Sequence, residues 1–192
     1  MTLRRCTDMA VADWLVQSAT AAHQLIVMGP EGFGAYARLR YVPDPAAVGQ
    51  SENDIDLPAD HPHDLDQARR ALHLLAAHTA TPDDCFFAVW DGYSDIHLPP
   101  GPLLTGLPYR EFALLRGPLR AIDSWEADFG DGFPIAPPGF VWPADQSWCF
   151  TSDVDPHFAG IGAGPTAIGV LLGDPVLDVV AADPGAEQPF YY

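Results

Sequence analysis

The chain contains no lysine, and all nine of its basic residues are arginine, against 26 aspartates and glutamates. The resulting net charge of −17 over 192 residues disfavours contact with nucleic acid or an anionic membrane, and it attracts basic partners. We therefore expect a protein partner with a basic surface, no nucleic acid and no membrane. An acidic surface also keeps a protein soluble without any partner, so the charge alone leaves that simpler interpretation open.

Cysteine is scarce, and long apolar runs are missing. The three cysteines, Cys6, Cys85 and Cys149, show no CxxC spacing. The apolar neighbours of Cys85 and Cys149 predict buried free thiols, which favours a reducing cytoplasm. No stretch approaches ~20 uninterrupted apolar residues, and the N-terminus has no apolar run of signal-peptide length. We therefore expect a cytoplasmic protein with neither a membrane span nor a signal peptide.

Apolar residues are plentiful: 48% of the chain is hydrophobic and 11% is aromatic, enough for a packed core in one domain. Apolar alternation and continuous apolar runs indicate strands, and apolar residues at helical spacing indicate helices. Strands are predicted at residues 25–28, 33–41, 85–90, 109–115, 147–154 and 177–181, and helices at about residues 8–20, 60–78, 119–129 and 165–172.

These elements predict one α+β domain over residues 1–192, with a mixed sheet of about six strands and helices mainly on one face. The last strand, loop, helix and strand favour a right-handed crossover and a parallel pair. Residues 42–63 are polar and rich in proline, which predicts a mobile loop. Residues 130–146 are predicted to form a second loop, and residues 183–192 a loosely attached tail.

The main candidate site is the segment that contains Asp153, Asp155 and His157, three polar groups within five residues at a strand end. Two carboxylates and an imidazole suit a divalent metal ion, and β alternation places both carboxylates on the same side. The same residue types also form tight turns, because an aspartate side chain hydrogen-bonds its own backbone two residues on. Both interpretations stay open.

The next segment, residues 160–164, has glycine at every second position. Gly160, Gly162 and Gly164 precede a predicted helix, as in loops that hold phosphate through backbone N–H groups. The spacing is neither GxGxxG nor GxxxxGK[ST], so we interpret the segment as a flexible connection. We include Gly160, Gly162 and Trp142 with Asp153, Asp155 and His157 in a candidate binding surface.

Several segments together resemble a family of uncharacterised actinobacterial proteins. They are GFGAYARL at residues 32–39, HTATPDDCFFAVWDGY at 78–93, WPADQSWCFTSDVDPHFAGIG at 142–162 and AIGVLLGDPVLDVV at 167–180. The resemblance covers most of the chain and implies no activity, cofactor or catalytic residue. The chain departs from the family at residues 42–63, where relatives carry a longer segment that contains tryptophan.

Two functions therefore compete. The first is an acidic cytoplasmic protein-binding module without a cofactor, such as an immunity protein that neutralises a toxin, anchored by an exposed aromatic residue beside an acidic patch. The alternative is a metal-assisted hydrolase or small-ligand enzyme centred on Asp153, Asp155 and His157. A structural or regulatory domain of a larger assembly is also compatible with the sequence.

Overall fold

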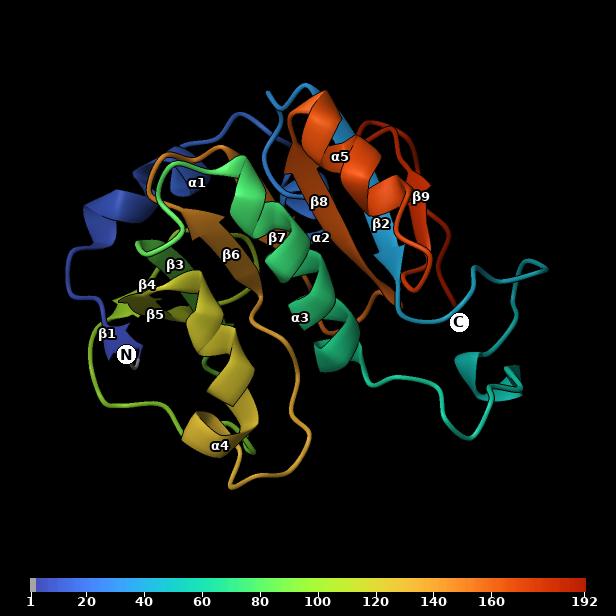
Figure 1. Cartoon of the computed structure of the whole chain (residues 1–192), viewed down its shortest axis with the longest axis horizontal. Helices are drawn as coiled ribbons and strands as arrows, with labels where there is room; N and C mark the ends of the chain where they lie inside the picture. Colours follow the sequence, from blue (N-terminus) through green and yellow to red (C-terminus); the bar gives the residue numbers. More distant parts are fainter. Residues whose placement is uncertain (1–2) are drawn as a thin grey trace.

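The computed structural model describes residues 3–192, which form one antiparallel sheet of nine strands with five α-helices (Figure 1). The order of the strands is β1-β5-β3-β6-β7-β8-β2-β9, and β4 pairs with β5 beside this path. This arrangement confirms the predicted single α+β domain. The strands are β1 (Arg4–Arg5), β2 (Ala35–Arg40), β3 (Cys85–Trp90), β4 (Leu103–Leu104), β5 (Phe112–Gly117), β6 (Phe140–Pro143), β7 (Trp148–Thr151), β8 (Phe158–Ala163) and β9 (Val179–Ala181).

The predicted mixed sheet and its parallel pair are wrong, because every strand pair in residues 3–192 is antiparallel. The segment predicted as a glycine-rich loop is strand β8, which turns back directly alongside β7. The final strand β9 then pairs with β2 instead of β7. One missed strand thus changed the predicted topology of the whole C-terminal part.

Helices cover both faces of the sheet. On one face lie α3 (Asp64–Leu75), α4 (Trp125–Phe129) and α5 (Pro165–Leu172), in front of the sheet in Figure 1. The other face carries α1 (Asp13–Val16) and α2 (Ala22–Met28), whose apolar side chains join a separate cluster. No helix in residues 3–192 is both long and apolar enough to cross a membrane. Short 3₁₀ helices lie at Met9–Ala12, Glu52–Asp54, Ala76–His78 and Leu119–Ser124.

Strand β3 lies inside the sheet, between β5 and β6, and is buried on both faces, as its continuous apolar sequence predicts. Phe87 and Val89 belong to the core under α3 and α4. Phe86 and Ala88 belong to the core under α1 and α2. The sheet is therefore the middle layer of three.

The run Leu25–Ile26–Val27–Met28 is helical, in the second half of α2, and its prediction as a strand is wrong. Four buried apolar residues in a row suit either a buried strand or a buried helix, so periodicity could not decide between them. The helix is buried because α2 packs closely against β8. A Cβ atom on Gly160 would lie 2.4 Å from the carbonyl oxygen of Val27.

The glycines of β8 thus allow close packing and do not indicate a flexible loop. Gly160 and Gly162 pair with β2 and β7 through the ladder, opposite Thr151 and Cys149. With no side chain, they let α2 and the ring of Phe33 approach the sheet. A further strand, β6, lies within residues 130–146, which the sequence predicted to be loop throughout.

The C-terminal tail lies against the polar loop that follows β2. The Tyr191 hydroxyl donates a hydrogen bond to the carbonyl oxygen of Pro43 at 2.5 Å. The ring of Phe190 lies 5.9 Å from that of Phe158, and Tyr192 N–H donates to the Gln50 carbonyl oxygen. The contacts of Tyr191 and Tyr192 join the tail to residues 42–63, and the contact of Phe190 joins it to β8. The mobility of residues 42–63 stays a prediction.

Candidate functional site

Asp153 and Asp155 follow β7, and both carboxylates face the guanidinium of Arg110. The Nε atom of Arg110 lies 2.8 Å from Asp153 Oδ1, and its Nη2 atom donates to Asp153 Oδ2 at 3.2 Å. The same Nη2 atom donates to Asp155 Oδ2 at 3.2 Å. The two carboxylates therefore converge, although β7 ends before them and strand alternation does not apply, and they converge on an arginine.

Arg110 is held from a second side by an aromatic ring. Its guanidinium lies 4.5 Å from the centre of the Trp90 ring, a cation–π contact. Tyr93 packs edge-on against Trp90 at 5.2 Å. Burial, assisted by the negative charge of Asp153, raises the pKa of Tyr93 to about 12, so its hydroxyl stays protonated at neutral pH. Arg110 is therefore fixed in position by one ring and two carboxylates.

His157 lies in a different cluster. Only 4% of the residue is exposed, and its Nε2 atom lies 3.0 Å from Asp44 Oδ1. Asp44 also accepts two hydrogen bonds from Arg38, at 2.6 and 3.0 Å, and one from Arg40. Burial lowers the pKa of His157, although Asp44 opposes that effect, and the arginines lower the pKa of Asp44.

The three residues of the predicted site are thus divided between two ion-pair clusters. Asp153 and Asp155 bind Arg110, whereas His157 binds Asp44. In the part of the chain that the structure describes, no three His, Cys, Asp or Glu side chains are grouped as ligands for a metal ion. The structure gives Asp153 and Asp155 the role of holding Arg110.

The other sequence-predicted residues lie in the core. Gly160 and Gly162 are buried in β8, and Trp142 in β6 is 1% exposed. The ring of Trp142 stacks on Phe86 at 5.4 Å. None of these three residues lies at the surface near Asp155.

The cysteines are free and buried. Burial raises the pKa of Cys85 and of Cys149 to about 12, with nearby carboxylates assisting at Cys85. Both thiols therefore stay protonated at neutral pH and are poor nucleophiles. This agrees with the inert burial predicted from their apolar neighbours.

Sequence reasoning missed the residue next to Arg110. Tyr109 is 78% exposed and has a φ of 66°, in the left-handed region that few residues other than glycine adopt. The Arg110 N–H donates to the Pro108 carbonyl oxygen at 2.8 Å across it, which makes a γ-turn with positive φ, a rare and strained form. Residues 109–115 were predicted to be a strand, but β5 begins at Phe112.

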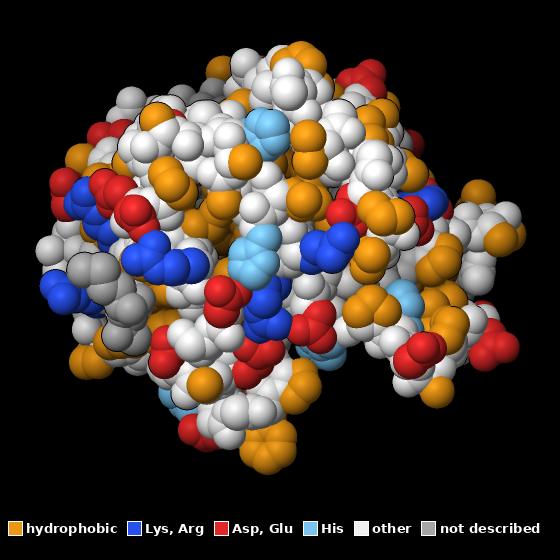
Figure 2. Space-filling model, in the orientation of Figure 1, with side chains coloured by type: hydrophobic (Ala, Val, Ile, Leu, Met, Phe, Trp, Pro, Cys, Tyr) orange, Lys and Arg blue, Asp and Glu red, His pale blue; other side chains and the backbone are white. Residues whose placement is uncertain are grey.

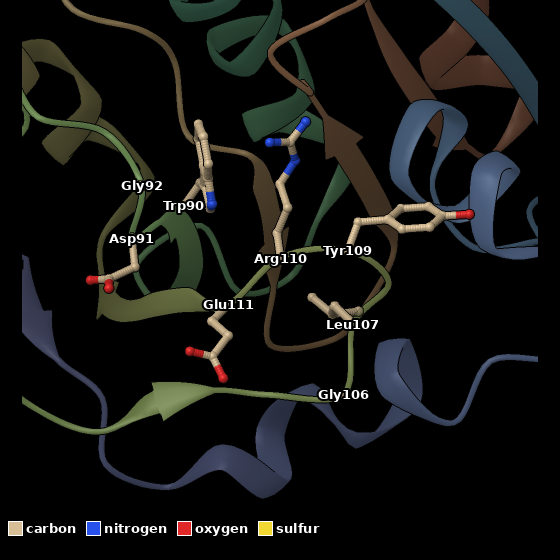
Figure 3. A pocket seen from close by; sticks show the side chains of 8 residues that line it. All are labelled: Trp90, Asp91, Gly92, Gly106, Leu107, Tyr109, Arg110 and Glu111. Atoms are coloured by element: carbon tan, nitrogen blue, oxygen red, sulfur yellow. The ribbon is translucent and has the colours of Figure 1, made fainter.

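Two hollows flank Tyr109. One of about 420 Å³ is lined by Trp90, Asp91, Tyr109, Arg110 and Glu111, among others, and Figure 3 shows the Asp91 and Glu111 carboxylates pointing away from the Tyr109 ring. The other, of about 200 Å³, is more enclosed and is described below. We define the Tyr109 surface as Tyr109 with the four carboxylates that line these hollows, which belong to Asp91, Glu111, Asp153 and Asp155.

Most arginines of the chain are already paired with carboxylates. Seven of the nine form ion pairs, which include Arg69 with Asp66 and Arg70 with Asp174. Figure 2 shows acidic and basic side chains next to one another on the face that carries α3. Most of the positive charge is thus neutralised by carboxylates of the same chain. Because carboxylates outnumber arginines, many carboxylates of residues 3–192 have no basic partner.

At the Tyr109 surface, Arg110 pairs with two of the four carboxylates, those of Asp153 and Asp155, and Asp91 is close enough to Arg5 to act on its charge. The surface is therefore negative around an exposed aromatic ring, held by a rigid scaffold of Trp90, Arg110 and Asp153. Such a surface suits contact with a positively charged group and offers no complete set of catalytic side chains.

Protein-family models, curated proteins and solved structures were compared with the chain, and none of them matches it. The resemblance to actinobacterial proteins stays a prediction.

Proposed function

We propose that this protein binds a basic partner protein and that the Tyr109 surface is the contact. The observation that carries the proposal is the 78% exposure of Tyr109 in a strained γ-turn, beside two hollows that acidic residues line. Backbone strain of this kind is unfavourable by about 1–3 kcal/mol and clusters at functional positions. A ring left in water at the tip of a strained turn contributes little to folding, so a role in binding explains why it is there.

An exposed tyrosine is well suited to anchor a protein interface. Tyrosine is among the residues that carry most of the binding energy in interfaces, because its large rigid ring loses little entropy when it is buried. Its hydroxyl remains available for a hydrogen bond to the partner. The Trp90–Arg110–Asp153 contacts fix the backbone that follows the ring. The anchor is therefore held in place before the partner arrives.

The charge of the chain explains the choice of a basic partner. A net charge of −17 and a locally negative contact surface attract positive proteins and raise their association rate. An immunity protein that covers the basic active site of a toxin is one form that this function takes. The alternative, a metal-assisted hydrolase at Asp153, Asp155 and His157, is less well supported because Arg110 and Asp44 bind those side chains separately.

A photo-crosslinking amino acid placed at position 109 tests the proposal in lysate of the source organism. The matched control carries the same amino acid at position 133, since Phe133 is 73% exposed and follows α4 on the opposite face of the sheet. The captured protein is then purified, and its binding to wild type, Tyr109→Ala and Phe133→Ala is measured at several ionic strengths.

We expect a partner captured at position 109 and not at 133, with a basic surface. Its association rate should fall at least about tenfold when the salt concentration rises from about 0.05 to 0.5 M. Tyr109→Ala should weaken binding by at least about tenfold, as an anchor residue would, whereas Phe133→Ala should not. Equal capture at both positions, or an affinity that does not depend on Tyr109 or on salt, would contradict the proposal.

A further inference from the structure

We infer that one lysine or arginine side chain of the partner enters the hollow of about 200 Å³ between α2, the Asp153–Pro156 turn and the C-terminal tail. This inference rests on the proposed function and names the chemistry of its contact. Tyr109 and Arg110 border this hollow as well as the larger one, so the exposed ring stands at its edge. The hollow is smaller than the roughly 300–1,000 Å³ typical of small-molecule sites, which favours a single side chain.

The walls of the hollow match the stem of a basic side chain. Ile26 and Val27 of α2 lie on one side, and Pro156 and Phe190 complete the apolar lining. Lysine and arginine carry three or four methylene groups, which they pack on apolar surface while the charged head stays near water or a carboxylate. A purely polar ligand would leave these walls without a partner.

The charged end of the hollow has one carboxylate that is not fully used. Asp153 is 11% exposed and contacts Arg110 through both of its oxygens. Asp155 is 80% exposed and meets Arg110 only through Oδ2, at 3.2 Å. Among residues 3–192, none donates a hydrogen bond to Asp155 Oδ1 within normal distance. Asp155 therefore has an exposed oxygen available for an incoming cation, whereas Asp153 is largely buried beside Arg110.

The tail supplies the last wall. The ring of Phe190 lies 5.7 Å from that of His23 and 5.9 Å from that of Phe158, so it is held between α2 and β8. Phe190 lines this hollow together with Asp153, Asp155 and Pro156. Without the Phe190 ring, the stem of an inserted side chain would contact water on that side.

A second hollow of the molecule provides a matched control. It is lined by His73, Asp83, Leu119 and Arg120, among others, so it offers the same residue types. Asp83 is 75% exposed and pairs with Arg120, much as Asp155 pairs with Arg110. It lacks the exposed tyrosine and the second carboxylate that line the hollow of about 200 Å³. Asp83→Asn therefore removes an equally exposed, arginine-paired charge from a place where we expect no partner.

The test uses the full ¹⁵N-labelled chain and small probes in place of the partner's side chain. Amide signals are followed by NMR while n-butylammonium is added at constant ionic strength, and n-butanol and butyrate serve as neutral and anionic counterparts. The titrations are repeated with Asp155→Asn, Asp83→Asn and Phe190→Ala, whose dispersed amide spectra show that each variant is folded.

We expect n-butylammonium to shift the amide signals of His23, Val27 and Asp155 more than n-butanol does, and butyrate to have no effect there. Asp155→Asn should weaken this binding about three- to fivefold, the change that corresponds to one partly exposed ion pair. Phe190→Ala should weaken it as well, and Asp83→Asn should leave it unchanged. Equal shifts from n-butanol, or an unchanged affinity in Asp155→Asn, would overturn the inference.

The same variants separate this inference from the proposed function. A captured partner whose affinity falls in Tyr109→Ala and also in Asp155→Asn supports both. A partner that depends on Tyr109 but not on Asp155 retains the proposed function and overturns the entry of a basic side chain. Selective binding of n-butylammonium without any partner captured at position 109 contradicts the proposed function and leaves the cation preference of the hollow in place.

Discussion

Arg110 and Asp153 meet through two nitrogens of the guanidinium, with Nε 2.8 Å from Oδ1 and Nη2 3.2 Å from Oδ2. The contact joins the segment before β5 to the segment after β7, which lie 43 residues apart in the chain. Because Asp153 is largely buried, its charge depends on Arg110 for compensation. The pair therefore fixes the backbone on which Tyr109 is displayed.

Replacement of Arg110 by methionine should lower the free energy of unfolding by about 2–3 kcal/mol, because it leaves the Asp153 carboxylate buried without its partner. The double variant Arg110→Met/Asp153→Asn should recover part of that loss, since the uncompensated charge is then gone. Urea unfolding of the wild type and the variants measures both quantities. An Arg110→Met protein as stable as the wild type would show that the pair does not hold this part of the fold.

Replacement of Tyr109 by glycine should separate stability from binding. Glycine adopts positive φ without strain but adds entropy to the unfolded chain, so the free energy of unfolding should change by no more than about 1 kcal/mol in either direction. Partner binding should still weaken at least about tenfold, because the anchoring ring is gone. Thermal unfolding and a binding assay with the captured partner check the two parts. A large loss of stability would instead assign the ring a structural role.

The sequence predicted the fold well where local pattern and burial agree. The alternation of Ala35, Ala37 and Leu39 and the apolar run of β3 predicted two strands correctly, and Pro165 marked the start of α5. It failed at α2 and β8, because their mutual packing is not visible in either segment alone. Four apolar residues suit a helix as well as a strand, and a glycine that admits a neighbouring helix looks like one that loosens a loop.

The candidate site was predicted only in part, because its contacts also join segments that are far apart in the sequence. Asp153 and Asp155 do face the same group, as predicted, but they follow β7, so strand alternation is not the reason. The distance along the chain to Arg110 and to Asp44 concealed which groups they and His157 bind. Tyr109 was missed because a Leu–Pro–Tyr–Arg sequence carries no local signal for a γ-turn with positive φ.

Two glycines of one segment allow a direct test of the packing between α2 and β8. Gly160→Ala would place a Cβ atom 2.4 Å from the Val27 carbonyl oxygen and 2.6 Å from Met28 Cα, so the helix must move. We expect a loss of about 1–3 kcal/mol in the free energy of unfolding. Gly164→Ala meets nothing within 4 Å and should change stability by less than about 0.5 kcal/mol. Equal effects in urea unfolding would contradict the close approach of α2.

Lowering the pH should remove the stability that the ion pair between Arg70 in α3 and Asp174 after α5 contributes to the fold. Asp174 accepts hydrogen bonds from Arg70 at 2.9 and 2.8 Å and from the N–H groups of Val176 and Leu177, and Arg70 is the main reason that its pKa is lowered to about 2. A carboxyl group with a lowered pKa stabilises the fold above its unfolded-state pKa of about 4 and loses that effect as the pH falls toward 2.

The wild type should therefore exceed Asp174→Asn in stability at pH 5, and the difference should shrink between about pH 4 and pH 2. Urea unfolding at intervals of half a pH unit measures this difference directly. Arg70→Gln provides the matched control, because it keeps the carboxylate but removes the main cause of the lowered pKa, so its stability should change less between pH 4 and pH 2 than that of the wild type. A wild-type advantage that stays constant from pH 5 to pH 2 would mean that Asp174 acts through its shape and not through its charge.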